Sequence, residues 1–130
     1  MRLPLVAALI LAGAGASAQE TDIGADLYAA SCGGCHGAKA DGKGPLSEVF
    51  NIPVPALTDL AARHDGRFPM SEVVRAIDGR TEARGHDGVM PSFGTLFSHE
   101  YAGRGSDDDV LIEVRGKILS IALYLESIQR

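Results

Sequence analysis

The sequence predicts a small all-α domain, and three observations lead to this fold class. Apolar residues recur at helical spacing, and no run alternates apolar with polar residues for long enough to predict a strand. The chain has 130 residues, 45% of them hydrophobic and 5% aromatic, a length that suits one domain better than two. Its 16 glycines are many for so small a domain, so we expect a bound group to order the flexible backbone.

The N-terminus has the pattern of a secretory signal peptide. Arg2 supplies a positive charge, residues 3–12 are apolar apart from one proline, and Ala-Ser-Ala at 16–18 forms a small-x-small cleavage site. The apolar run is about half of the ~20 residues that span a bilayer. We therefore expect residues 1–18 to be a signal peptide cleaved after Ala18. Residues 19–130 are then one periplasmic domain without a transmembrane segment.

Four helices are predicted in the mature chain. The first covers residues 22–31 and stops at a Gly-Gly pair, and a short second one lies around residues 57–63. The third has Ser71 as its N-cap, runs through Ile77 and ends at Gly79 in the C′ position. The last covers residues 107–128, where three aspartates suit the positive end of the helix dipole. Its apolar stripe has 3-4-3-4-3 spacing and consists of Leu111, Val114, Ile118, Ile121, Leu125 and Ile128.

Long irregular segments separate these helices. Glycine and proline punctuate residues 37–55, and glycine punctuates residues 80–105, so both segments are expected to be mostly loop. This much loop in a small domain favours a chain that wraps around a ligand.

The charge balance excludes one class of partner. The formal net charge is −5, and without residues 1–18 there are 11 basic against 17 acidic residues, a charge of −6. Such a chain lacks the basic footprint that binds nucleic acid. A protein partner with a basic docking face fits it better.

The motif that carries chemistry is Cys-Gly-Gly-Cys-His at residues 32–36. C-x-x-C-H is the signature of covalent c-type haem attachment: two thiols on one tight turn add to the two vinyl groups of the porphyrin, and the adjacent imidazole reaches the iron. A redox dithiol uses the same C-x-x-C spacing but lies in a βαβ unit. Structural zinc normally takes four ligands, and the other histidines show no paired spacing. These two alternatives stay open but are weaker.

Further motifs in order along the chain strengthen the haem interpretation. Gly44-Pro45 follows the Cys-x-x-Cys-His motif, Met90-Pro91 lies in the second half, and Ile-Ala-Leu-Tyr-Leu occupies residues 121–125. With these motifs the chain resembles the small monohaem cytochrome c family of class I, which has His and Met axial ligands. The resemblance implies a cytochrome c-like fold, with about four to five helices wrapped around one covalently attached haem. It also implies that the first and last helices cross at Gly24, Tyr28, Ile121 and Tyr124.

The resemblance assigns five site residues. Cys32 and Cys35 would attach haem c, and His36 and Met90 would be the axial ligands of its iron. The backbone carbonyl of Pro45 would accept a hydrogen bond from the proximal His36.

Two residues of the mature chain compete for the sixth position. Pro91 biases Met90 toward extended backbone, whereas Met70 lies beside a helix start and suits a packing staple. Three further side chains near this segment, Arg80, Arg84 and His86, have no assigned role: they suit either the haem propionates or solvent.

The expected function is that of an exported electron carrier. No Ser/His/Asp arrangement or carboxylate pair stands out, so no catalytic residue is predicted. Redox proteins would be its donor and acceptor, and the protein would be a monomer or a subunit of a respiratory complex. Two alternatives remain: a sensor or enzyme in which Met90 gives way to a small ligand, and a fixed cytochrome subunit of an oxidase or dehydrogenase.

Overall fold

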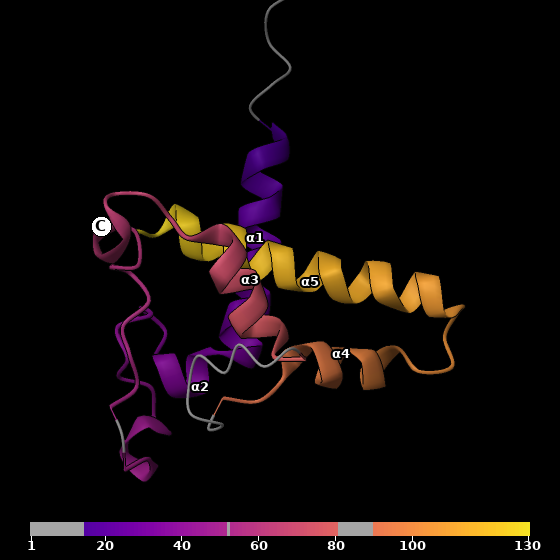
Figure 1. The fold of residues 1–130 in the computed structure, drawn as a ribbon, viewed down its shortest axis with the longest axis horizontal. Coiled ribbons are helices and arrows are strands. Elements are labelled where there is room, and N and C mark those ends of the chain that lie inside the picture. The colour runs from indigo at the N-terminus through magenta and orange to yellow at the C-terminus, as the bar shows by residue number, and fades with distance from the viewer. Residues whose placement is uncertain (1–14, 52, 81–89) are drawn as a thin grey trace, which may run out of the picture.

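The computed structural model describes residues 15–51, 53–80 and 90–130, with the side chains described from residue 22 onward. Within these ranges the chain is helical and contains no strand, which confirms the all-α prediction (Figure 1). The helices are α1 (Gly15–Ser31), α2 (Gly33–His36), α3 (Met70–Asp78), α4 (Phe93–Tyr101) and α5 (Asp107–Ser127), with 3-10 turns η1 (Ser47–Val49) and η2 (Ala62–His64).

The fold is organised by the crossing of α1 and α5, as the resemblance implied (Figure 1). At the crossing a Cβ on Gly24 would collide with the backbone carbonyl of Ser120, so glycine is what lets the two helix backbones touch. One helical turn further along α1, the rings of Tyr28 and Tyr124 lie 5.3 Å apart between centroids. Aromatic contact and close backbone approach together hold the two ends of the domain on each other.

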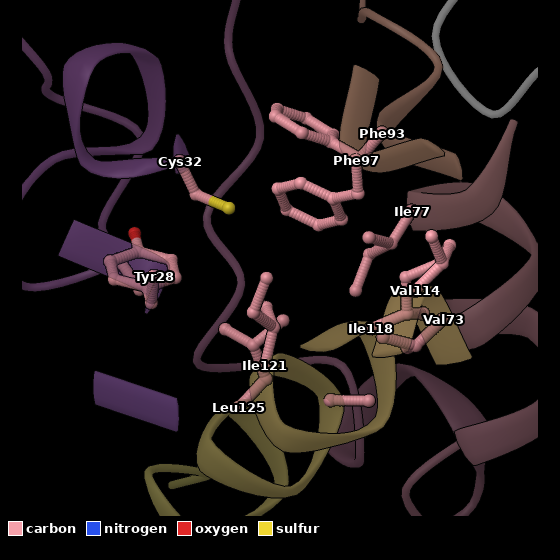
Figure 2. Close-up of a cluster of buried hydrophobic side chains, with 12 residues drawn as sticks. Tyr28, Cys32, Val73, Ile77, Phe93, Phe97, Val114, Ile118, Ile121 and Leu125 are labelled. Carbon is pink, nitrogen blue, oxygen red and sulfur yellow. The ribbon is translucent and has the colours of Figure 1, made fainter. Parts of the chain in front are cut away.

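The hydrophobic core forms where α3 and α4 pack against α5 (Figure 2). Four central positions of the predicted α5 stripe are buried: Val114, Ile118, Ile121 and Leu125. Four side chains meet them from the neighbouring helices: Val73 and Ile77 from α3, and Phe93 and Phe97 from α4. The 3.6-residue period therefore placed the buried face of α5 correctly.

Helix ends differ in part from the expected ones. α5 starts in a capping box, in which the Ser106 hydroxyl accepts from Asp109 N and the Asp109 carboxylate accepts from Ser106 N. α3 starts two residues earlier than expected, with Pro69 rather than Ser71 at the N-cap. It ends as predicted at Gly79, whose φ of 64° is left-handed.

The prediction of an irregular segment over residues 80–105 was wrong in one part, because α4 lies inside it. The Ser92 hydroxyl accepts a hydrogen bond from Thr95 N and caps this helix. At its far end Lys117 of α5 donates to the Glu100 carboxylate at 2.8 Å and lies 4.9 Å from the centroids of the Phe97 and Tyr101 rings. Packing on α5 thus stabilises a helix that is too short to persist alone.

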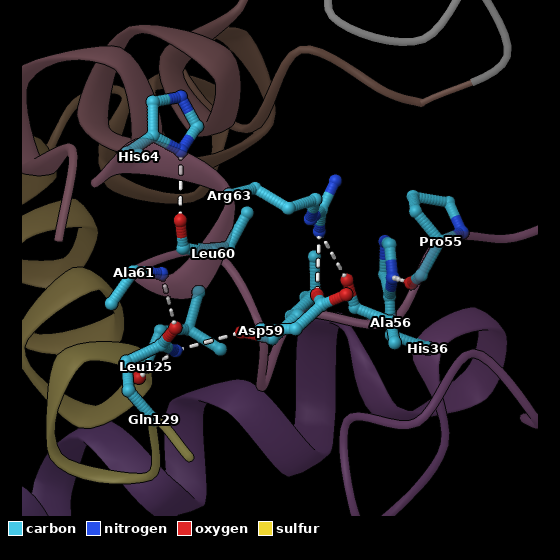
Figure 3. A network of polar contacts seen from close by, with 11 residues as sticks. His36, Pro55, Ala56, Asp59, Leu60, Ala61, Arg63, His64, Leu125 and Gln129 are labelled. Atoms are coloured by element: carbon cyan, nitrogen blue, oxygen red, sulfur yellow. Dashed lines mark hydrogen bonds and ion pairs between the residues drawn. The ribbon is translucent and has the colours of Figure 1, made fainter. Parts of the chain in front are cut away.

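Two other boundaries shifted. α1 begins at Gly15, so it runs through the predicted cleavage position, and cleavage itself stays a prediction. Residues 57–61 form turns that lead into η2 rather than a regular helix. The Gln129 side chain attaches these turns to the end of α5, since it accepts from Ala61 N at 2.9 Å (Figure 3). It also donates to Leu57 O at 2.7 Å. In the described ranges no helix combines the length and apolar character needed to cross a bilayer.

Candidate functional site

The Cys-x-x-Cys-His motif is folded into one helical turn at the end of α1. Cys35 N and His36 N both donate to Cys32 O, at 3.1 and 2.9 Å. Cys32 and His36 are buried, and neither cysteine is joined in a disulfide. Both thiols and the imidazole are therefore presented by a single rigid turn.

A backbone contact from the following loop supports this turn. Gly44 N donates to Cys35 O at 3.1 Å, and Leu46 N donates to Gly34 O at 2.9 Å. A Cβ on Gly44 would collide with backbone atoms of Gly34 and Cys35. Gly44 therefore lets the loop lie directly against the backbone of the motif.

The partner of His36 corrects one prediction. His36 Nδ1 lies 3.0 Å from the carbonyl oxygen of Pro55 (Figure 3), whereas Pro45, which was expected to supply this carbonyl, is exposed beside the Gly44 contact. The physical reason is that the loop first packs on the motif's backbone at Gly44 and reaches the imidazole only at its far end. A carbonyl acceptor requires the proton on Nδ1, so Nε2 carries the lone pair of the neutral ring.

Burial also sets the protonation of the site. Desolvation lowers the pKa of His36, and its hydrogen bond to the Pro55 carbonyl opposes this only in part. Desolvation, with repulsion from Cys35, raises the pKa of Cys32 to about 12. Neutral pH therefore leaves the imidazole uncharged, which is the form that binds a metal, and leaves Cys32 a neutral thiol.

Tyr28 connects the site to the helix crossing. Its hydroxyl donates to Gly37 O at 2.7 Å, directly after the motif. Burial raises the pKa of this phenol above its ordinary range, so the hydroxyl stays a donor. Tyr28, a residue of the helix crossing that precedes the motif, is thereby bonded to Gly37, the residue that follows the motif.

The motif opens onto a cavity of about 460 Å³ that has Cys32, Cys35, His36 and Met90 in its wall. A second hollow of about 260 Å³ shares Cys32, His36 and Met90 with it. In Figure 2 the sulfur of Cys32 points toward the side of the core that Phe97 occupies. The remaining lining is mostly apolar: Ala30, Leu46, Phe50, Pro53, Val54, Pro55, Pro91, Phe93, Leu96 and Phe97.

These residues fit a haem. Two hollows that share Cys32, His36 and Met90 in their walls suit a broad flat group, and the apolar wall suits a porphyrin. The thiols lie on the wall where thioether bonds would form, and the donor pair of imidazole and thioether suits a haem iron. By contrast, among the described residues no three His, Cys, Asp or Glu side chains form a group that could hold a bare metal ion.

The structure distinguishes between the two methionines that compete for the sixth position. Both side chains pack against the core cluster, but Met90 lines both hollows, whereas Met70, the first residue of α3, lines neither of them. Arg80 pairs with Asp78 in the structure. Arg84 and His86 lie outside the described residues.

The comparison with known families agrees with this site. Residues 19–104 match the family described as cytochrome c oxidase, cbb3-type, subunit III. The chain belongs to this family of c-type cytochromes. No curated protein and no solved structure matches it significantly. The cytochrome is thus a haem c electron-transfer protein with a cytochrome c-like fold.

Sequence reasoning missed Pro55 as the partner of His36. Residues 53–55 have the sequence Pro-Val-Pro, which by itself predicts only a loop. One sequence feature could have indicated Pro55. A stretch with two prolines has a stiff backbone and few N–H groups, which suits a carbonyl that accepts a hydrogen bond from a fixed position. It was not decisive, because Gly44-Pro45 carries a similar signal closer to the motif.

Proposed function

We propose that the cytochrome transfers single electrons through one haem c that is covalently attached to Cys32 and Cys35. In this proposal His36 and Met90 are the axial ligands of the iron. The observation that carries it is that these four side chains, from two distant parts of the chain, line one apolar cavity. The haem iron would supply the one-electron chemistry by changing between its ferric and ferrous states.

His36 is prepared for its role by its surroundings. The Pro55 carbonyl holds the proton on Nδ1, which fixes the tautomer and the orientation of the ring. Burial keeps the imidazole neutral, so binding a metal at Nε2 does not have to displace a proton. The ring would thus keep one orientation in both oxidation states of a bound haem iron.

Met90 and the cavity wall determine which oxidation state is favoured. A neutral thioether stabilises the ferrous state relative to an imidazole or thiolate ligand. The buried rings of Phe93 and Phe97 make part of the cavity wall apolar, and a low dielectric around a bound haem would disfavour the extra positive charge of the ferric state. Both effects would raise the reduction potential.

The mouth of the cavity is where a redox partner would approach. Leu46 and Leu96 line the cavity and are each 50% exposed, so they place apolar surface at its edge. We propose that protein donors and acceptors dock over this edge, and that basic groups on them are attracted by the acidic chain. Export through a cleaved signal peptide would place the encounter in the periplasm.

The family match favours a subunit of an oxidase complex over a free carrier, because the family itself is described as an oxidase subunit. A tagged copy purified from its host in mild detergent distinguishes the two. Stoichiometric recovery of other haem proteins supports the subunit. Recovery of the cytochrome alone supports the free carrier.

Ligation is tested with two methionine variants of the haem-loaded protein. Met90→Ala should remove the methionine-iron absorption band of the oxidised form, lower the reduction potential and let the ferrous form bind carbon monoxide. Met70→Leu is the matched control, because a volume-conserving core change leaves the iron untouched and costs under about 1.5 kcal/mol of stability. Loss of the band in Met70→Leu, with Met90→Ala unchanged, would reverse the assignment.

A further inference from the structure

The segments on either side of residues 81–91 are joined to each other. The Ser92 hydroxyl donates to Asp78 O at 2.8 Å, so the start of α4 is bonded to the last residue of α3. Gly79 packs so closely here that a Cβ on it would lie 2.9 Å from Ser92 Cα. The end of α3 and the start of α4 therefore touch through their backbones.

An ion pair completes this junction. Arg80 Nε lies 2.5 Å from Asp78 Oδ1, and Arg80 Nη2 lies 3.0 Å from Asp78 Oδ2, a two-point contact between guanidinium and carboxylate. The buried Gly94 lies against the pair, and a Cβ there would collide with Asp78 Oδ1, Asp78 O and Arg80 Nε. We call the five residues Asp78, Gly79, Arg80, Ser92 and Gly94 the clasp.

The clasp lies close to Met90 along the chain. Only Pro91 separates Met90 from Ser92, and two residues span at most about 7 Å. Proline also fixes its own φ and restricts the backbone of the residue before it. A movement of Ser92 therefore moves Met90 as well, because few backbone torsions between them are free to compensate.

The clasp is also continuous with the cavity wall. Ile77, directly before Asp78, lines the second hollow, and Phe93, directly after Ser92, lines the first. Both side chains are buried in the core cluster. The clasp therefore connects the rigid core to the residue that reaches the cavity.

We propose that the clasp is a positioning device that holds the Met90 sulfur at the cavity, and that loosening it releases Met90 from the iron. This inference rests on the proposed function, in which Met90 is the sixth ligand. It also assigns a role to Arg80, which aligns Asp78 against Gly94. The clasp residues act through Met90 and do not themselves contact the haem in this proposal.

The test uses two clasp variants of the haem-loaded protein. Gly94→Ala inserts a methyl group between the ion pair and α4, and Ser92→Ala removes the hydroxyl that joins the two helices. We expect both to weaken the methionine-iron band of the oxidised form. Ferrous carbon monoxide affinity should rise about fivefold in Ser92→Ala, the effect of losing the one hydrogen bond that joins Ser92 to Asp78 O, and about tenfold or more in Gly94→Ala.

Two controls separate positioning from general stability. Ser98→Ala removes a hydroxyl that donates to Gly94 O at 2.6 Å within α4, without touching α3. It should lower the melting temperature slightly and leave the band and carbon monoxide affinity unchanged. Ser92→Thr keeps the hydroxyl and should restore wild-type values. If Gly94→Ala does not fold, the Ser92 pair still decides the question.

The outcomes distinguish the two proposals. If Ser92→Ala and Gly94→Ala lower stability but keep the wild-type band and carbon monoxide affinity, the clasp is only structural and the inference fails. If Met90→Ala also has a wild-type spectrum, the ligand assignment itself fails. A changed Met90→Ala spectrum with unchanged clasp variants overturns the inference alone.

Discussion

Gly24 of α1 lies directly against the backbone carbonyl of Ser120 in α5, with no room for a side chain between them. This contact lies one helical turn before Tyr28, whose hydroxyl is bonded to Gly37 beside the Cys-x-x-Cys-His turn. The geometry of the helix crossing is thus transmitted to the residues that would hold the haem.

Gly24→Ala should therefore destabilise the protein. The added methyl group forces the helices apart, at a cost of about 1–3 kcal/mol in the free energy of unfolding. Gly116→Ala in α5 is the matched control, because a Cβ there would meet no packing neighbour within 4 Å, and alanine favours a helix by about 0.5–1 kcal/mol. Urea denaturation of both variants measures the difference. Equal stabilities would show that the helices do not meet as described.

Replacing both cysteines should abolish covalent haem attachment. Cys32→Ala combined with Cys35→Ala leaves no thiol on the turn and should give a protease-sensitive apoprotein, because the cavity loses the group that orders its loops. Haem staining after a denaturing gel measures attachment, and each single variant should keep part of the stain. Haem that stays with the double variant through denaturation would refute the attachment proposal.

Acid should weaken the start of α5 in a way that depends on Asp109. Hydrogen bonds from Ser106 lower the pKa of its carboxyl below the ordinary 3.8. A carboxyl with a lowered folded pKa stabilises the fold above its unfolded pKa and loses this contribution as the pH falls through the folded value. Asp109→Asn should therefore be slightly less stable than wild type at pH 7 and equal to it in strong acid.

The measurement is the urea midpoint of both proteins from pH 7 down to about pH 2. Asp108→Asn is the control, since it removes a charge in the same helical turn and leaves the capping box intact. A constant difference between wild type and Asp109→Asn across this range would contradict the role of the carboxylate.

Electron transfer to a cationic acceptor should slow as salt is added. Residues 19–130 have a formal charge of −6, and ions screen their attraction over a distance of ~8 Å at physiological salt. Stopped-flow rates at increasing ionic strength measure this, with an anionic acceptor as the control that should accelerate. A rate that does not depend on salt would show that docking relies on the apolar edge at Leu46 and Leu96.

Much of this protein is determined by its local sequence. The period of residues 107–128 predicted α5 and its buried face, and Gly79 predicted the end of α3, because side-chain spacing and backbone freedom are local properties. The Cys-x-x-Cys-His motif pointed to haem c for the same reason: its chemistry requires two thiols and an imidazole on one turn. Met90 was favoured over Met70 because Pro91, the residue that follows it, biases its backbone away from a helix.

Only the tertiary structure decided which backbone carbonyl meets His36 and where α4 forms. Every residue offers a carbonyl, and both Pro45 and Pro55 lie in stiff backbone, so residue type does not decide between them; the place of Pro55 depends on how the loop first packs at Gly44. Residues 93–101 become a helix because α5 covers their apolar face and Ser92 caps their start. The contact between Gly94 and the Asp78–Arg80 pair likewise joins residues 14 or more positions apart, and such long-range packing leaves no periodic trace in the sequence.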